Sequence, residues 1–137
     1  MPQMVWLVDD DPEFRSAMVM MFRMLGYESR QFVEARPVGL ALLAGERPDL
    51  IFLDISMPHV SGLELLRFIR SREVYNRLPI LMMTSDSSDQ TVEKAIRIGA
   101  DGYIFKPVNF EELQMAINTA IQRRKVTASL KDKTKPV

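Results

Sequence analysis

The chain has 137 residues, of which 47% are hydrophobic and 26% charged, a composition typical of a globular protein long enough to bury a core. It contains no cysteine and a single histidine, which excludes disulfides, thiolate metal sites and multi-histidine metal sites. No apolar run approaches the roughly 20 residues of a membrane span, and no signal-peptide pattern opens the chain, so a cytoplasmic location is expected.

The 18 basic and 18 acidic residues balance, but they are unevenly distributed. Residues 123–137 hold six basic residues and one acid, so the remaining 122 residues have 12 basic and 17 acidic side chains, a net charge of −5. A body of this sign is a poor nucleic-acid binder, so no direct contact with nucleic acid is predicted, and none with a membrane. The basic end is predicted to be a solvated tail or the start of a linker.

Short apolar runs alternate along the chain with segments in which apolar residues recur at helical spacing. Five runs are predicted to be strands, over residues 4–8, 27–33, 49–54, 78–83 and 103–105. The five segments that follow them are predicted to be helices, over residues 12–25, 37–45, 61–69, 88–98 and 109–121. This alternation predicts a single α/β domain with a parallel sheet.

Local signals support several of these assignments. Asp11 followed by Pro12 is typical of a helix start, and Ser61 with Glu64 three residues later forms a capping box. The third and fourth apolar runs are continuous rather than alternating, which indicates strands buried on both faces. The second helix has the weakest pattern, and its apolar stripe is expected to consist of three residues. These are Leu40, Leu43 and Ala44.

Polar residues follow four of the predicted strands. They are Asp9, Asp10 and Asp11 after the first strand, Asp54 after the third, Thr84 after the fourth and Lys106 after the fifth. Because ligands of open parallel α/β sheets bind beyond the carboxyl ends of the strands, we expect these groups to lie together at one edge. Several carboxylates in one place raise one another's pKa unless a cation lies among them, and oxygen ligands of this kind suit Mg²⁺.

One lysine and one hydroxyl beside such a cluster indicate a second, anionic ligand. Lys106 offers a positive charge and Thr84 a hydrogen-bond donor for phosphoryl oxygens. An aspartate between a divalent cation and a lysine can act as a nucleophile toward phosphorus, because both cations offset the repulsion between a carboxylate and a phosphate. The pattern therefore favours phosphoryl chemistry at Asp54.

Four segments, in this order, resemble the signature segments of bacterial response-regulator receiver domains. They read LVDDDP at residues 7–12, DLIFLDISMP at 49–58, MTS at 83–85 and GADGYIFKP at 99–107. The resemblance covers about residues 3–123, which predicts a receiver domain over residues 1–124 and a basic tail or truncated linker over 125–137. It implies a doubly wound (βα)5 fold, with five helices around a five-stranded parallel sheet of flavodoxin-like order 2-1-3-4-5.

The resemblance also implies the chemistry of the site. Asp54 would accept a phosphoryl group from a phosphohistidine on a sensor histidine kinase or a histidine phosphotransfer protein. Asp9 and Asp10 would hold Mg²⁺ together with Asp54 and the backbone carbonyl of Ser56. Asp11, which stands where glutamate is common in the family, is interpreted as a helix cap rather than a ligand. The chain is therefore expected to catalyse only its own phosphorylation and slow dephosphorylation.

Three further roles follow from the same resemblance. Lys106 would pair with the phosphoryl oxygens, and its bond to Pro107 is expected to be cis. Thr84 would move toward the phosphoryl group while Tyr103 rotates inward behind it. This coupled shift would reshape the face of the fourth helix, fifth strand and fifth helix, where output partners bind or a phosphorylation-linked dimer forms. Ser56 and Asp86 occupy positions that influence the phosphoryl lifetime in the family.

Other functions remain as alternatives. A metal-dependent phosphohydrolase would need a second acid two residues after its nucleophile, and that position is Ser56. A nucleotide-binding switch would need a glycine-rich phosphate loop, which the sequence lacks. A phosphorylation-independent protein-interaction domain on the same fold stays open. His59 is interpreted as an exposed loop residue, and Met20 and Met24, four apart on the first helix, are a candidate partner contact.

Overall fold

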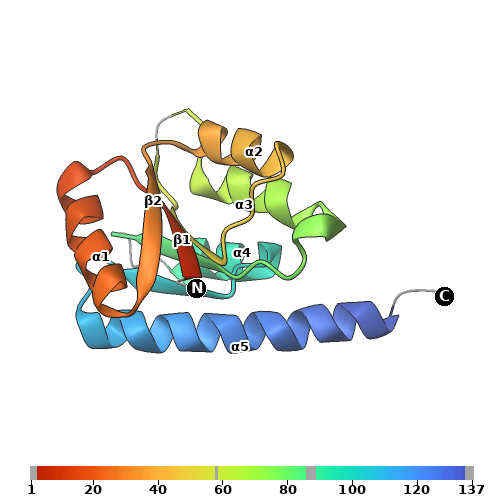
Figure 1. The fold of residues 1–137 in the computed structure, drawn as a ribbon. Coiled ribbons are helices and arrows are strands. Elements are labelled where there is room, and N and C mark those ends of the chain that lie inside the picture. Colours follow the sequence, from red (N-terminus) through yellow and green to blue (C-terminus); the bar gives the residue numbers. More distant parts are fainter. Residues whose placement is uncertain (1–2, 58, 86–88, 135–137) are drawn as a thin grey trace.

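The structure of the protein is a computed structural model that describes residues 3–57, 59–85 and 89–134. Its strands and helices alternate along the chain (Figure 1). They are β1 (Gln3–Val8), α1 (Pro12–Met24), β2 (Tyr27–Phe32), α2 (Ala35–Leu43), β3 (Leu50–Asp54), α3 (Gly62–Arg70), a short 3-10 helix η1 (Glu73–Tyr75), β4 (Ile80–Thr84), α4 (Asp89–Ile98), β5 (Gly102–Phe105) and α5 (Phe110–Thr134).

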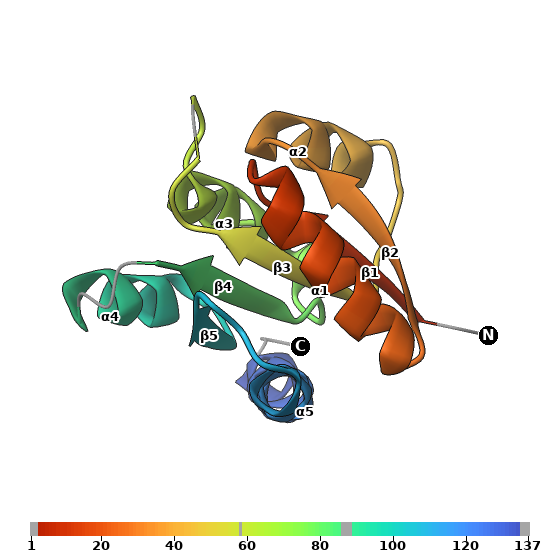
Figure 2. The same ribbon diagram turned by 90° about the vertical axis from the view of Figure 1, so that its left-hand side faces the viewer.

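The five strands form one parallel sheet in the order β2-β1-β3-β4-β5, which confirms the predicted fold class and strand order. One hydrophobic core lies between the sheet and α1 and α5, and a second lies between the sheet and α2, α3 and α4 (Figures 1 and 2). All five residues of β3 and of β4 are buried, as their continuous apolar runs predicted. These two strands therefore hold the carboxyl edge of the sheet rigidly in the middle of the molecule.

The predicted N-caps of α1 and α3 are confirmed. The Asp11 carboxylate accepts hydrogen bonds from the backbone N–H groups of Glu13 and Phe14, at 3.0 and 3.4 Å. The Ser61 hydroxyl accepts one from the N–H of Glu64 at 3.2 Å. Each cap satisfies N–H groups that the first turn of a helix leaves without partners, so both helices begin where the sequence indicated.

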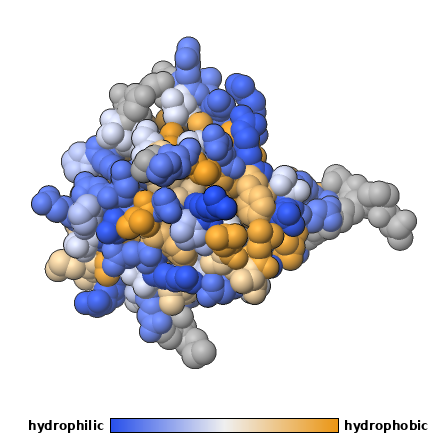
Figure 3. Space-filling model, turned by 90° about the horizontal axis from the view of Figure 1, so that it is seen from above, coloured by the Kyte–Doolittle hydropathy of each residue, from blue (hydrophilic) through white to orange (hydrophobic). Residues whose placement is uncertain are grey.

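The predicted apolar stripe of α2 is wrong. The helix begins at Ala35, two residues earlier than expected, and it buries Val38 and Leu42, whereas Leu40 and Leu43 are 58% and 54% exposed. Figure 3 shows the molecule from the side on which α2 lies, where apolar surface gathers. Because α2 is apolar on both faces, with Arg36 as its one charged residue, periodicity could not indicate which face is buried.

The last helix is longer than predicted. It was expected to end near residue 121, but α5 continues to Thr134, so the predicted domain boundary at residue 124 falls inside a helix (Figure 1). Arg124 and Ala128 are 5% and 1% exposed, so this stretch is not simply a solvated tail. Within the described residues, no helix combines the length and hydrophobicity that crossing a lipid bilayer requires.

A buried charge network explains why Arg124 lies inside. The Asp101 carboxylate pairs with Arg70 of α3 at 2.9 Å and with Arg124 of α5 at 2.8 Å, and it accepts the N–H of Ile80 at 2.9 Å. Both guanidinium groups also donate to the carbonyl of Gly99, at 2.8 and 3.0 Å. The network therefore joins α3, the start of β4, the start of β5 and α5 at the end of the sheet opposite the candidate site.

Candidate functional site

The carboxyl ends of β1 and β3 bring three aspartates together. Asp9 and Asp10 follow β1, Asp54 ends the neighbouring strand β3, and one carboxylate oxygen from each lies within 4.8 Å of the others. Asp9 and Asp54 are buried, at 0% and 4% exposure, whereas Asp10 is exposed. The structure thus assembles the acidic cluster that the strand ends predicted, with Asp10 at its rim.

Lys106, directly after β5, reaches into this cluster. Its ammonium nitrogen lies 2.6 Å from Asp9 Oδ2 and 3.3 Å from Asp54 Oδ2. The backbone N–H of Lys106 donates to the carbonyl of Thr84 at 2.9 Å, which ties the end of β5 to the end of β4. The bond from Lys106 to Pro107 is cis, as predicted. The hydrogen bond to β4 therefore holds Lys106 at the edge of the sheet, where its side chain reaches the aspartates.

Phe14 is a contact that the sequence reading missed. The Lys106 ammonium lies 4.4 Å from the centroid of its ring, which places the positive charge against an aromatic side chain of α1 as well as two carboxylates. Phe14 packs against the core between the sheet and α1 and α5 but is only partly buried, which leaves its ring accessible to Lys106. Phe14 and Lys106 are far apart in the sequence, so only the structure shows that they are in contact.

The charges in the site are poorly balanced. Burial and the neighbouring Asp9 carboxylate raise the pKa of Asp54 from 3.8 to about 6, although Lys106 and the Ser56 N–H, which donates to Asp54 Oδ1 at 3.1 Å, act to lower it. Burial lowers the pKa of Lys106, but its contacts with Asp9 and Asp54 outweigh this and raise it above its usual value. One ammonium thus faces more negative charge than it can neutralise.

The donor set fits a divalent cation. Asp9 Oδ2 is buried and, although the Lys106 ammonium is near, receives no well-directed hydrogen bond from any residue in the described part of the chain. A buried carboxylate oxygen in this situation is costly unless a cation coordinates it. The ligands available are all oxygens, which suits Mg²⁺ rather than a transition metal. The acidic cluster is therefore compatible with a magnesium ion held among Asp9, Asp10 and Asp54.

The remaining predicted residues lie around this cluster. Thr84 ends β4 beside β3 and is 1% exposed. Ser56 is in the loop after β3, and its side chain is exposed. Tyr103 is 41% exposed on β5, with its ring 5.3 Å from that of Phe105, so it lies outside the site. His59 has a φ of 69° in an exposed loop, as interpreted from the sequence.

Two further predictions concern Met20 with Met24 and Asp86. Met20 and Met24 are 65% and 70% exposed on α1, so neither is part of the core, and a partner contact there stays a hypothesis. Asp86, which was predicted to influence the phosphoryl lifetime, lies outside the described residues.

Gly62, the first residue of α3, lets the chain pass directly against Asp54. A Cβ atom at this position would overlap the carbonyl oxygen of Asp54, while the N–H of Gly62 donates to the carbonyl of Ile55 at 3.1 Å. Backbone cannot yield as a side chain can, so Gly62→Ala is expected to lower the free energy of unfolding by about 1–3 kcal/mol.

Gly39 provides a matched control for this prediction. It lies within α2, and an added Cβ would make ordinary contacts of 3.9 Å with Leu65 and Phe68. Gly39→Ala should therefore leave stability unchanged or raise it by up to about 1 kcal/mol, since alanine favours the helix. Urea unfolding of both variants measures the difference, and equal effects would show that the close approach at Gly62 has no energetic importance.

The raised pKa of Asp54 has a measurable effect on stability. Its folded-state pKa, about 6, lies above the usual 3.8, so the stability contributed by the protonated carboxyl is complete below 3.8 and lost as the pH rises through 6. In metal-free protein, Asp54→Asn is therefore expected to raise the free energy of unfolding at pH 8 by about 1–3 kcal/mol, and to change it little near pH 4. Urea unfolding in EDTA tests this, and a gain that is larger at pH 4 than at pH 8 would contradict it.

Curated proteins with a similar sequence are longer than this chain. It is 31% identical over 119 residues to the phosphate regulon transcriptional regulatory protein PhoB of Pseudomonas aeruginosa, covering 87% of this chain and 52% of that protein. It is 37% identical over 117 residues to the DNA-binding transcriptional regulator NtrC of Proteus hauseri, covering 85% and 24%. The chain thus spans about a quarter to about half the length of these relatives.

Solved structures with a similar fold include one of about the same length as this chain and one that is much longer. The chemotaxis protein CheY4 of Vibrio cholerae has a TM-score of 0.78 and 29% identity, covering 88% of this chain and 99% of that chain. NtrX from Brucella abortus has a TM-score of 0.81 and 28% identity, covering 96% and 29%. A family model, the response regulator receiver domain, matches residues 5–118, which include every residue of the candidate site. The chain therefore belongs to the receiver domains of two-component response regulators.

Proposed function

We propose that Asp54 is the phosphoacceptor and that it takes a phosphoryl group from a phosphohistidine on a histidine kinase or a histidine phosphotransfer protein. One observation carries the proposal. A buried aspartate carboxylate lies between an acidic cluster fit for a divalent cation and the ammonium of Lys106, 3.3 Å away. With a divalent cation bound, an aspartate in this position would lie beside the two positive charges that favour the attack of a carboxylate on phosphorus.

In the proposed step, a carboxylate oxygen of Asp54 attacks the phosphorus atom of the donor. An O–P bond forms, the P–N bond to the donor histidine breaks, and the leaving imidazole takes up a proton from solvent. Asp54 reacts as its carboxylate, which predominates above a pKa of about 6. Lys106 is close enough to transfer its hydrogen bond from Asp54 to the incoming phosphoryl oxygens.

A bound Mg²⁺ would neutralise the charge that the phosphoryl oxygens share with the surrounding carboxylates. Asp9, Asp10 and Asp54 would hold it, with the carbonyl of Ser56 as a further ligand. The Ser56 N–H already orients Asp54 through Oδ1, at 3.1 Å. The buried cluster and Lys106 have no evident role in a domain that acts without phosphate, so the phosphorylation-independent alternative is not favoured.

The proposed output is a change at the β5 surface rather than turnover of another substrate. Thr84 would hydrogen-bond the phosphoryl group from the end of β4, and Tyr103 would rotate inward behind it. Tyr103, Phe105 and the exposed Met115 of α5 line one groove of about 640 Å³ along β5 and α5. Inward rotation of Tyr103 would change the shape of this groove, which would alter the binding of an output partner.

The dependence on magnesium tests the proposal. Intact-mass spectrometry after incubation with acetyl phosphate should find one phosphoryl adduct in the presence of Mg²⁺ and none in EDTA. An adduct that forms equally well in EDTA would exclude the role assigned to the acidic cluster, because the carboxylates would then repel the phosphate without a counterion.

A further inference from the structure

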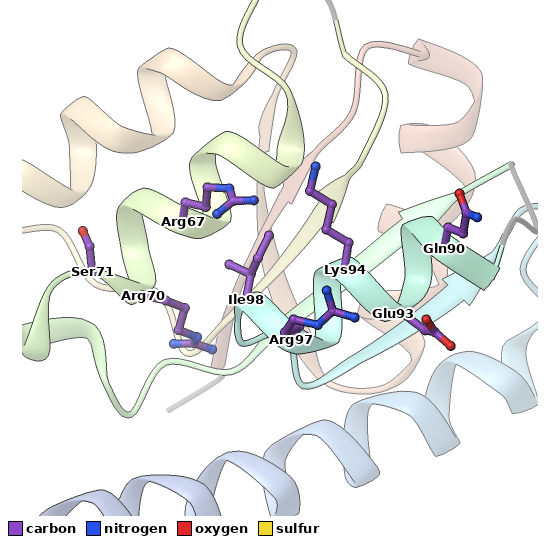
Figure 4. Close-up of a pocket in the computed structure, with 8 residues that line it drawn as sticks. All are labelled: Arg67, Arg70, Ser71, Gln90, Glu93, Lys94, Arg97 and Ile98. Atoms are coloured by element: carbon purple, nitrogen blue, oxygen red, sulfur yellow. The ribbon is translucent and has the colours of Figure 1, made fainter.

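A groove of about 670 Å³ lies between α3 and α4 (Figure 4), and none of its described lining residues lines the groove along β5. Its charged lining consists of Arg67 and Arg70 from α3 and Glu93, Lys94 and Arg97 from α4. Four of these five side chains are basic, although residues 1–122 as a whole have a net charge of −5. The groove is therefore a basic surface on an acidic body.

Arg70 does not contribute a free charge to this surface. Its guanidinium pairs with Asp101 at 2.9 Å and donates to the carbonyls of Leu78 and Gly99 at 2.7 and 2.8 Å. Four hydrogen bonds and burial fix this side chain, so it forms a rigid wall rather than a binding group. The remaining charge of the groove depends on the other four residues.

Three cations of the groove have no anionic partner in the part of the chain that the structure describes. Arg67, Lys94 and Arg97 are all exposed, and their side chains form no hydrogen bond or ion pair with a described residue. The charged ends of Arg67 and Lys94, from opposite walls, lie on the same side of the groove (Figure 4). Glu93 is the one acidic residue among the described residues that line the groove, so these three cations and Glu93 together carry a net charge of +2.

Helix stability explains only part of this arrangement. Arg67 and Arg97 lie in the last turns of α3 and α4, where a cation interacts favourably with the helix dipole. Lys94 lies nearer the middle of α4 and three residues before Arg97, a spacing at which like charges repel. Lys94 facing Arg67 across the groove adds further repulsion, which an anion bound between them would relieve.

The lining indicates which class of anion fits. None of the described residues that line the groove is aromatic, so nucleobases would find no stacking surface there. The acidic body would also repel a continuing nucleic-acid backbone. The three cations are exposed and spread over two helices, so a compact ion could not be enclosed by them. Individual exposed ion pairs are weak, and several carboxylates on one chain would bind through their combined effect.

We propose that the α3–α4 groove binds an acidic segment of a partner protein, with carboxylates paired to Arg67, Lys94 and Arg97. This surface is separate from the β5 groove assigned to output, and its chemistry does not require phosphorylation of Asp54. It therefore adds a second docking surface, selected by charge, to the domain.

The proposal is tested on the full, unphosphorylated chain by NMR titration with a short peptide of alternating glutamate and alanine. Amide signals of α3 and α4 around the three cations should shift, the affinity should fall with added salt, and the same peptide with glutamine should cause no shift. Arg67→Glu together with Arg97→Glu should weaken binding about tenfold or more.

A matched variant controls for net charge. Arg123→Glu with Lys125→Glu makes the same charge change on exposed residues of α5 and should leave peptide binding within about twofold of the original. Signals shifting mainly on α5, equal weakening by the two double variants, or no binding would overturn the proposal. Tighter binding of inorganic triphosphate or of a thymidine oligonucleotide than of the glutamate peptide would also overturn it, in favour of a small anion or a nucleic acid.

Discussion

Asp101→Asn is expected to lower the free energy of unfolding by about 3–5 kcal/mol, because it leaves two buried guanidinium groups without their carboxylate. Asp101, Arg70 and Arg124 are all nearly inaccessible to solvent, with side chains 2%, 7% and 6% exposed. Burial and repulsion by Arg124 already lower the pKa of Arg70 to about 10, and Asp101 is the anion that acts against both. Without the negative charge of Asp101, nothing offsets the repulsion between Arg70 and Arg124.

The intact network itself adds little net stability. Burial raises the pKa of Asp101 despite its two arginines, so desolvation outweighs pairing and the intact network is not a large net source of stability. Replacing one residue of the network is nevertheless costly, because it leaves the charges of the others buried without a partner. A control is the exposed pair between Arg30 and Glu46, at 3.0 Å with side chains 45% and 51% exposed.

Urea unfolding of Asp101→Asn and of Glu46→Gln compares the buried network with that surface pair. Glu46→Gln should change the free energy of unfolding by at most about 1 kcal/mol, since water solvates both partners. A loss for Asp101→Asn no larger than that for Glu46→Gln would mean that the network does not hold α5 to the domain.

Lys106→Met is expected to slow phosphorylation by acetyl phosphate about 10²–10³-fold, while Mg²⁺ binds at least as tightly as in the unmodified protein. Methionine keeps approximately the length of the side chain but removes the positive charge, which lies 2.6 Å from Asp9, 3.3 Å from Asp54 and 4.4 Å from the centroid of the Phe14 ring. The same ammonium repels a cation bound to those carboxylates, so its loss favours the metal and disfavours the phosphoryl group.

This opposite pair of effects separates a chemical role from a structural one. Lys125→Met, at an exposed position of α5, removes a lysine far from the cluster and should change neither rate nor metal affinity. Intact-mass spectrometry measures the phosphorylation rate of each variant, and calorimetry measures its affinity for Mg²⁺. An unchanged rate in Lys106→Met would exclude its proposed role, and weaker Mg²⁺ binding would indicate that the site had been distorted.

The site could be predicted because its residues stand at the ends of strands that the sequence identifies clearly. The apolar runs over 50–53 and 78–83 are continuous, so β3 and β4 were expected to be buried. The residues that end these strands were therefore expected to lie at one edge of the sheet. The grouping of Asp9, Asp10 and Asp54 then follows from parallel topology alone. The electrostatic interactions among these aspartates, and therefore the pKa of Asp54, depend on distances that only the structure gives.

Features that depend on contacts distant in sequence were missed. Arg124 was counted with a basic tail, because nothing near it indicates that Asp101 will pair with it across 23 residues of chain. Arg70, 31 residues before Asp101, was assigned no role for the same reason. The stretch of α5 after residue 121 has no regular apolar stripe, so periodicity did not indicate that the helix continues.

The most direct test of the central claim is to compare the unmodified protein with Asp54→Asn by intact-mass spectrometry after incubation with acetyl phosphate and Mg²⁺. Asparagine preserves the shape of the side chain but cannot form an acyl phosphate. We predict a single phosphoryl adduct on the unmodified protein and none on Asp54→Asn. An adduct of equal yield on the variant would place the phosphoryl group on another residue and contradict the assignment of Asp54.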